Sequence, residues 1–200
     1  MPRQIALNIV EKELGEPGLV VDVGGGPGSF LSAFLARFNT TRGIWYDISE
    51  PMMTLAKERL ARYGDRVSFT LAGFENTSGL PSNVDVIVTS RALHHLPVSQ
   101  VRRFYTEAAD RLSDPGWLIN LDHVGLAKPW SERLLDTYMD MVPEARSQPS
   151  HEHRYRFATV PEHFEALRAA GLDDVDMPWR AFGMCLFMAR RPINGGGEFG

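Results

Sequence analysis

A glycine-rich stretch, Gly24–Gly28, contains the first residues whose types and spacing could do chemistry. It follows the apolar segment Val20–Val23, and a helical pattern begins after it at Ser29. Glycines at alternate positions remove the Cβ atoms that would keep a ligand from the backbone, and they permit the positive φ of a tight turn. The N-terminus of the following helix offers unpaired N–H groups and a partial positive charge. The stretch therefore predicts a turn that binds a carboxylate or a phosphate.

An acidic residue, Asp47, ends the next predicted strand, 25 positions after Asp22. In a strand–helix–strand unit, the carboxyl ends of both strands meet at one edge of the sheet, which places Asp47 beside the glycine turn. A carboxylate at this place can accept hydrogen bonds from both hydroxyls of a ribose. The alternative is that Asp47 caps a turn or the next helix.

Histidines are the candidates for proton transfer, because their ordinary pKa lies near neutrality. His123 follows a predicted strand and is our first candidate for a general base; the alternative is that it holds the next segment in place through a hydrogen bond. His94 and His95 lie in the loop after another strand, and we expect them near the substrate, with at least one in a structural role. His151 and His153 alternate as a metal-binding pair would, but no third ligand stands at a recognisable spacing. We therefore expect no metal, and we expect this pair to contact the substrate.

Alternating strand and helix patterns must position these residues. Such alternation predicts a parallel sheet with helices on both faces, and ligands bind at the carboxyl ends of its strands. Asp114–Gly116 is predicted to be a turn between the last helix and strand of this region. The expected strands are Leu19–Val23, Arg42–Asp47, Val67–Leu71, Val84–Thr89 and Trp117–Leu121, and the expected helices cover residues 2–14, 29–38, 49–63 and 100–112.

The alternation breaks after the fifth strand. Residues 124–158 contain one amphipathic helical pattern that includes Tyr138, and an insert at this place is a natural lid over the carboxyl edge. We expect a single domain over residues 1–192, followed by a flexible tail over residues 193–200. The C-terminal part of the domain is predicted to hold a helix that ends at Gly171 and an antiparallel hairpin of Val175–Trp179 and Phe182–Ala189 that turns at Arg180–Ala181.

The spacing of the glycines distinguishes two kinds of nucleotide-binding turn. The dinucleotide fingerprint is G-x-G-x-x-G, and Ser29 stands where its third glycine belongs. The form G-x-G-x-G resembles the first motif of the class I S-adenosylmethionine-dependent methyltransferases. Trp45–Ser49 looks like the end of that family's second strand, and Asp85–Leu96 looks like its fourth strand and the following loop. The resemblance covers residues 18–125.

The resemblance implies a fold and a reaction. The fold is a Rossmann-like, doubly wound α/β sheet of seven strands, mostly parallel, with an antiparallel C-terminal hairpin. The reaction moves a methyl group from the cofactor S-adenosylmethionine to an oxygen or nitrogen atom of a small organic molecule, and the protein's main task is to align the reacting atoms. The implied cofactor-binding residues are Asp22, Gly24, Gly26, Gly28, Asp47, Ile48, Gly73, Phe74, Ser90 and Arg91, and the expected substrate-binding residues are His94, His95, Tyr138, His151 and His153.

Individual roles follow from the matched positions. Asp22 would orient the ammonium group of the cofactor, Asp47 would bind its ribose, and Ser90 and Arg91 would lie beside its methionine end. The chain departs from the family where a Gly-Asp pair often follows the third strand, since Phe74 follows Gly73 here. Either Phe74 packs on the adenine ring, or a backbone group and Glu75 recognise it; the alternative is that Phe74 packs in the core.

Composition limits the classes of partner. The net charge is −4 over 200 residues, and no run of Lys or Arg suggests a nucleic-acid surface. No apolar run is long enough to cross a membrane, the N-terminus lacks the apolar region of a signal peptide, and the single cysteine, Cys185, lies in an apolar segment. We expect a cytoplasmic monomer or homodimer. A non-catalytic module that binds the cofactor or a partner is the alternative function, and Ser29 disfavours a nicotinamide-dependent oxidoreductase.

Overall fold

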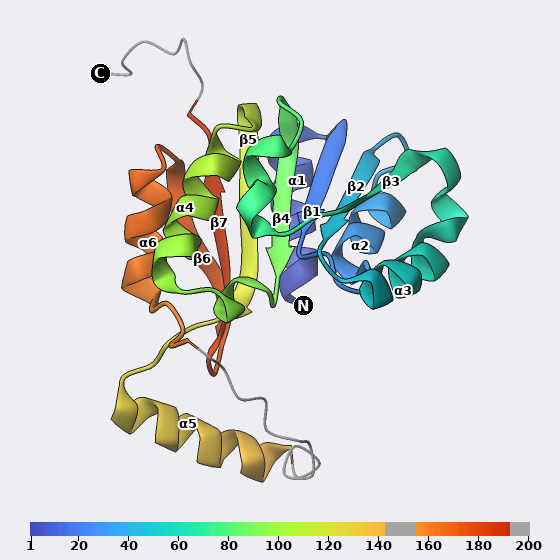
Figure 1. The fold of residues 1–200 in the computed structure, drawn as a ribbon. Helices are drawn as coiled ribbons and strands as arrows, with labels where there is room; N and C mark the ends of the chain where they lie inside the picture. The colour runs from blue at the N-terminus through green and yellow to red at the C-terminus, as the bar shows by residue number, and fades with distance from the viewer. Residues whose placement is uncertain (143–154, 193–200) are drawn as a thin grey trace.

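A computed structural model describes residues 1–142 and 155–192. Seven strands form one sheet in the order β3-β2-β1-β4-β5-β7-β6, in which β7 runs antiparallel to both of its neighbours (Figure 1). The predicted seven-stranded, mostly parallel α/β fold is therefore confirmed. The strands are β1 (Leu19–Val23), β2 (Arg42–Asp47), β3 (Val67–Leu71), β4 (Val84–Ser90), β5 (Leu112–His123), β6 (Asp173–Ala181) and β7 (Met184–Arg190).

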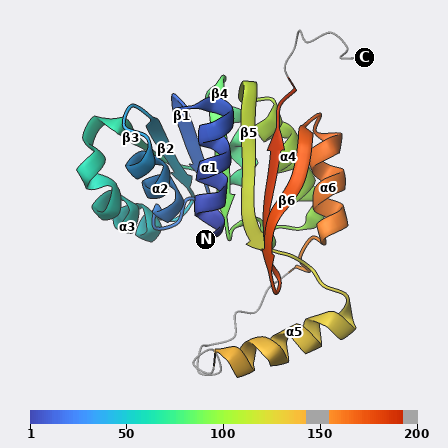
Figure 2. The same cartoon turned by 180° about the vertical axis from the view of Figure 1, so that it is seen from behind.

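Helices cover both faces of the sheet. Helices α4 and α6 pack on the face that is turned to the viewer in Figure 1, and α1 and α2 pack on the face that Figure 2 shows. Short 3₁₀ segments, at Ala61–Arg66, Phe74–Gly79 and Leu93–His95, complete the connections. The α-helices are α1 (Pro2–Leu14), α2 (Ser29–Arg37), α3 (Glu50–Leu60), α4 (Val98–Ala109), α5 (Lys128–Met141) and α6 (Val160–Ala169).

The central strands are buried on both sides because of this layering. In β1, Val20 belongs to the core on the α1–α2 side, and Val21 and Val23 belong to the opposite core. In β4, Val86 belongs to the core on the α1–α2 side, and Ile87 belongs to the opposite core. Two covered faces explain why these strands read as nearly continuous apolar segments. The predicted strands β1, β2 and β3 have the bounds that the pattern indicated.

The boundary between α4 and β5 differs from the prediction. The helix ends at Ala109 rather than at Leu112, and β5 already begins at Leu112, which pairs with Val84 of β4. Asp114–Gly116, predicted to be a turn, lies within β5 at a register shift between the two strands. The turn-forming residues thus mark an irregularity in a long strand, because pairing with β4 continues on both sides of them.

The C-terminal hairpin turns two residues later than predicted. Ala181 pairs with Met184, so the turn consists of Phe182 and Gly183. Phe182 has a φ of 53°, a backbone conformation that residues other than glycine seldom adopt. Its ring meets the ring of Tyr138 edge-on at 5.5 Å between centroids. This contact with α5 forms between distant segments and leaves no local signal in the sequence.

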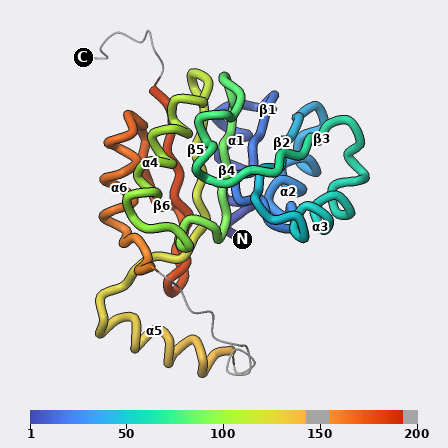
Figure 3. The backbone as a smooth tube through the Cα atoms, in the orientation of Figure 1, coloured from blue at the N-terminus to red at the C-terminus, as the bar shows by residue number. Residues whose placement is uncertain are grey.

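Helix α5 stands apart from the rest of the domain. It projects beyond the carboxyl ends of the parallel strands, and none of its residues is buried (Figures 1 and 3). The insert leaves and rejoins the domain at one place, where Gly125 forms a bridge with Thr159 and the Gly125 N–H donates to the Ala158 carbonyl at 2.9 Å. A single insert helix was expected, and its role as a lid stays a prediction. Within the described ranges, no helix has the length and apolarity to span a membrane.

Candidate active site

The glycine turn connects β1 to α2 through three residues of positive φ. Gly24, Gly26 and Gly28 have φ values of 68°, 49° and 73°. A Cβ on Gly24 would lie 2.7 Å from the Ala92 Cβ, whereas a Cβ on Gly26 would meet nothing within 4 Å. A Cβ on Gly28 would touch Leu60 of α3 at 3.0 Å. Gly24 therefore permits the approach of the β4 loop, Gly28 permits helix packing, and Gly26 presents open backbone.

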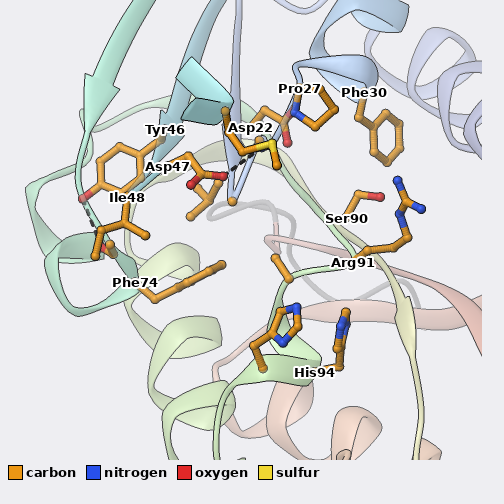
Figure 4. Close-up of a pocket in the computed structure, with 18 of the residues that line it drawn as sticks. Asp22, Pro27, Phe30, Tyr46, Asp47, Ile48, Phe74, Ser90, Arg91 and His94 are labelled. Carbon is orange, nitrogen blue, oxygen red and sulfur yellow. Dashed lines mark hydrogen bonds between the residues drawn. The ribbon is translucent and has the colours of Figure 1, made fainter. Parts of the chain in front are cut away.

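A cavity of about 1090 Å³ opens at the carboxyl ends of the strands, beside this turn (Figure 4). Most of the predicted site residues meet there, but Gly28 and Tyr138 do not line it, and His151 and His153 lie outside the described residues. The predicted residues that line the cavity are Asp22, Gly24, Gly26, Asp47, Ile48, Gly73, Phe74, Ser90, Arg91, His94, His95 and His123.

Asp22 is a buried acid at the wall of this cavity. It is 1% exposed, and its Oδ2 accepts a hydrogen bond from the Leu31 N–H in the first turn of α2 at 3.1 Å. Its Oδ1 has no hydrogen-bond partner among the described residues. Burial raises the pKa of Asp22 to about 7, against the opposing effect of the Leu31 hydrogen bond. A buried carboxylate with one unused oxygen is suited to a cationic ligand group.

Asp47 caps the turn, as one of the two alternatives expected, and its binding of a ribose stays a prediction. Its Oδ2 accepts from the Gly26 N–H at 2.8 Å, and its Oδ1 accepts from the Ser49 N–H at 2.9 Å, so the carboxylate fixes the turn. It also lines the cavity, and each carboxylate oxygen can accept a second hydrogen bond. The next helix is capped by Ser49, whose Oγ accepts from the Met52 N–H. Asp47 therefore remains available to a diol ligand.

Phe74 likewise has two roles. It lines the cavity, and its ring packs edge-on against Phe104 of α4 at 5.2 Å between centroids. Across the same end of the cavity lies Ile48, whose side chain is 68% exposed although it is apolar (Figure 4). The Tyr46 hydroxyl donates to the Asn76 carbonyl at 3.0 Å and thereby holds the segment that carries Phe74. An apolar slot between Ile48 and Phe74 is suited to a flat heterocycle.

His94, which lines the cavity, is paired with a buried acid that lies behind it. Asp122, at the end of β5, is 0% exposed, and its Oδ1 lies 2.5 Å from Nδ1 of His94. The His94 and Ala92 N–H groups donate to its Oδ2 at 3.1 and 3.3 Å, and the His123 N–H donates to its Oδ1 at 2.7 Å. The carboxylate therefore fixes both the loop after β4 and the orientation of one imidazole. Sequence reasoning missed this pair.

Aromatic rings surround His94. The ring centroids of His95, His123 and Phe157 lie 4.0, 5.2 and 5.4 Å from that of His94. Phe157 was not predicted as a site residue, and it reaches the cavity from the returning end of the insert. Gly125 makes this approach possible, because a Cβ there would lie 2.5 Å from the Phe157 carbonyl oxygen. No group of three or more metal-ligating side chains exists in the part of the chain that the structure describes.

Comparisons with known proteins identify the fold and the domain. Residues 20–116 match the family model described as a methyltransferase domain. The structure superposes on an O-methyltransferase family protein from Burkholderia thailandensis with a TM-score of 0.71, at 22% identity over 96% of this chain and 56% of that one. Residues 20–116 therefore correspond to a methyltransferase domain, and the described chain as a whole has the fold of the solved methyltransferases. The resemblance inferred from the glycine turn is thereby confirmed.

Two further similar proteins differ in how much of their length this chain matches. Magnesium protoporphyrin IX methyltransferase from Synechocystis PCC 6803, solved with bound SAH, has a TM-score of 0.68 at 19% identity, covering 94% of this chain and 81% of that one. A reducing polyketide synthase, Preu2 from Preussia isomera, is 30% identical over 79 residues, which are 38% of this chain and 3% of the synthase. The chain thus spans just over half of the Burkholderia protein and a small part of the synthase.

Proposed function

We propose that this protein is an enzyme that transfers a methyl group from S-adenosylmethionine to an oxygen or nitrogen atom of a small organic molecule. A methyltransferase domain implies this cofactor. The observation that carries the proposal is the arrangement of one cavity of about 1090 Å³, with Asp22, Asp47 and Phe74 around one part and the His94–Asp122 pair at another. This volume is at the upper end of those of ordinary ligand pockets, so a nucleoside and a small acceptor fit together.

The residues around the glycine turn fit the cofactor. The unpartnered Oδ1 of Asp22 suits the ammonium group, and the open backbone at Gly26 accommodates the amino-acid part without a clash. Asp47 retains acceptor capacity for the ribose hydroxyls, and Ile48 and Phe74 supply apolar surface for adenine. When bound, the cofactor supplies an electrophilic methyl group on its sulfonium.

His94 is the best-placed residue to accept the proton of the acceptor. With Nδ1–H donated to Asp122, the lone pair of the imidazole lies on Nε2, which can take a proton from a hydroxyl or amine as it becomes methylated. The Asp122 carboxylate then stabilises the imidazolium and keeps the ring in one orientation. The rings of His123 and Phe157 lie next to that of His94 and supply apolar surface at this part of the cavity.

His123, the base predicted from the sequence, lines the same cavity, and its role as a base stays a prediction. The carboxylate of Asp122 contacts the backbone N–H of His123 and the imidazole of His94, which favours His94 as the base. One experiment distinguishes His94 from His123 as the base. We expect His94→Gln to lower turnover by at least 10²-fold and His123→Gln to lower it less. Both variants should keep nearly unchanged affinity for SAH, the demethylated product of the cofactor.

The non-catalytic alternative predicts binding without turnover. Calorimetry with SAH and NAD tests the ligand, and we expect micromolar binding of SAH and none of NAD. Transfer of an isotopically labelled methyl group to a library of phenols, alcohols and amines tests the reaction. Binding of SAH without transfer to any acceptor would favour the non-catalytic module, and binding of NAD instead of SAH would refute the proposal. The monomeric or homodimeric state and the cytoplasmic location stay predictions.

A further inference from the structure

Two guanidinium groups line the cavity beside the start of α2, and neither forms an ion pair within the described ranges. Arg3 lies in the first turn of α1, and Arg91 directly follows β4. By contrast, Arg102 and Arg156 each form a double hydrogen bond with a glutamate. Arg3 lies outside the residues that match the family model and outside every motif found in the sequence.

The surrounding structure contacts the side chain of Arg3 and fixes the backbone of Arg91. The guanidinium carbon of Arg3 lies 5.5 Å from the centre of the Phe30 ring, in the first turn of α2. Arg91 has a φ of 53°, and its N–H donates to the Leu121 carbonyl at 2.9 Å. In Figure 4 its side chain extends toward Phe30. A residue other than glycine with positive φ is costly by about 1–3 kcal/mol and persists where the surrounding structure fixes it.

The charges at this end of the cavity are of both signs. Burial and the nearby charge of Arg91 lower the pKa of Arg3, while the charge of Asp22 raises it. The two arginines therefore repel each other, and both benefit from an anion between them. The buried Asp22, with its unpartnered Oδ1, needs a cation at the same end. A ligand that carries a carboxylate and an ammonium group on one carbon satisfies all three residues.

We propose that Arg3 and Arg91 together bind the carboxylate of the cofactor's amino-acid end, opposite the ammonium site at Asp22. The cofactor is then recognised as a zwitterion at this end. The inference rests on the proposed function and adds a residue from α1 to the site. A guanidinium group recognises a carboxylate through two parallel hydrogen bonds, which a neutral or single-point donor cannot reproduce. A phosphate dianion would instead meet the negative charge of Asp22.

The test compares two ligands that differ in one group. Calorimetry measures binding of SAH and of its analogue without the carboxylate to the wild type, Arg3→Gln and Arg91→Gln. We expect each variant to bind SAH about 10-fold or more weakly and to bind the decarboxylated analogue as tightly as the wild type does. Arg3→Lys, which keeps the charge and loses the fork, is expected to show a smaller loss. Lys12→Gln, at an exposed position of the same helix, is the matched control and should bind both ligands normally.

Three outcomes would overturn the inference or its premise. Unchanged affinity of both arginine variants for SAH would remove them from the site. An equal loss for SAH and the decarboxylated analogue would show that the arginines act through the structure and not through the carboxylate. Failure of the wild type to bind SAH would refute the proposed function itself, and so it is distinguishable from failure of the arginine assignment.

Discussion

The buried carboxylate of Asp22 allows a quantitative test, because its ionisation is coupled to folding. Burial raises its pKa from 3.8 to about 7 in the folded protein. A group whose folded pKa is raised contributes stability that is fully present below the unfolded value and is lost as the pH rises through the folded value. Above pH 7, the ionised Asp22 therefore costs the ligand-free protein about 4 kcal/mol, at about 1.4 kcal/mol per pKa unit.

Asp22→Asn removes this ionisation and keeps a side-chain oxygen for the Leu31 N–H. Relative to the wild type, the variant should gain about 2 kcal/mol of unfolding free energy between pH 5.5 and pH 8. Urea unfolding at several pH values measures the difference, and an unchanged m-value shows that both proteins unfold from equally compact states. A difference that stays constant with pH would refute the assigned burial. The stabilised variant is also expected to bind SAH more weakly, since the partner of the ammonium group is lost.

Three other predictions concern the turn, a buried histidine and the neck of the insert. Gly24→Ala should lower the free energy of unfolding more than Gly26→Ala does, because only the Cβ added at position 24 meets Ala92. Gly26→Ala should chiefly weaken SAH binding. Urea unfolding measures the stability of both variants, and calorimetry measures their affinity for SAH. His163 is buried against Phe187 and its Nδ1 lies 2.7 Å from the Tyr105 hydroxyl; burial lowers its pKa to about 4. A histidine whose pKa is lowered on folding contributes stability above its unfolded pKa of 6.5, and this stability is lost as the pH falls. The free energy of unfolding of the wild type should therefore lose about 3 kcal/mol, relative to that of His163→Gln, between pH 6.5 and pH 4. Gly125→Ala should displace the segment that carries Phe157 and lower turnover while affinity for SAH is retained; equal losses of both would contradict a role confined to the acceptor end.

The meeting of Asp22, the glycine turn and Asp47 at one cavity could be predicted from the sequence because its signals are local. The glycine spacing, and the position of Asp47 at the end of the second strand, depend only on one strand–helix–strand unit. Geometry inside such a unit is nearly constant, so residue types at fixed spacing determine which groups meet. The bounds of β1 and β2 were correct for the same reason, since β1 is followed by glycine and β2 ends at an aspartate.

The remaining parts depend on contacts between distant segments. The pair of His94 and Asp122 forms because the loop after β4 closes onto the end of β5, and nothing in either segment alone indicates the partner. The sequence pattern indicated His123 as the base and gave no role to the preceding Asp122. Arg3 reaches the cavity through the packing of α1 against the sheet, which the amphipathic pattern of that helix does not specify. Packing between distant segments therefore determines both the pairing of His94 with Asp122 and the position of Arg3.

The neck at Gly125 and Thr159 has an effect on how such a protein can diversify. Because the chain departs and returns at adjoining backbone positions, the segment between them can change in length and composition while β5 and α6 keep their places. The residues proposed to bind the nucleoside lie on other connections, at the ends of β1, β2, β3 and β4. On the proposed function, replacement of the insert alone would therefore change the contacts to the acceptor and leave the contacts to the methyl donor unchanged.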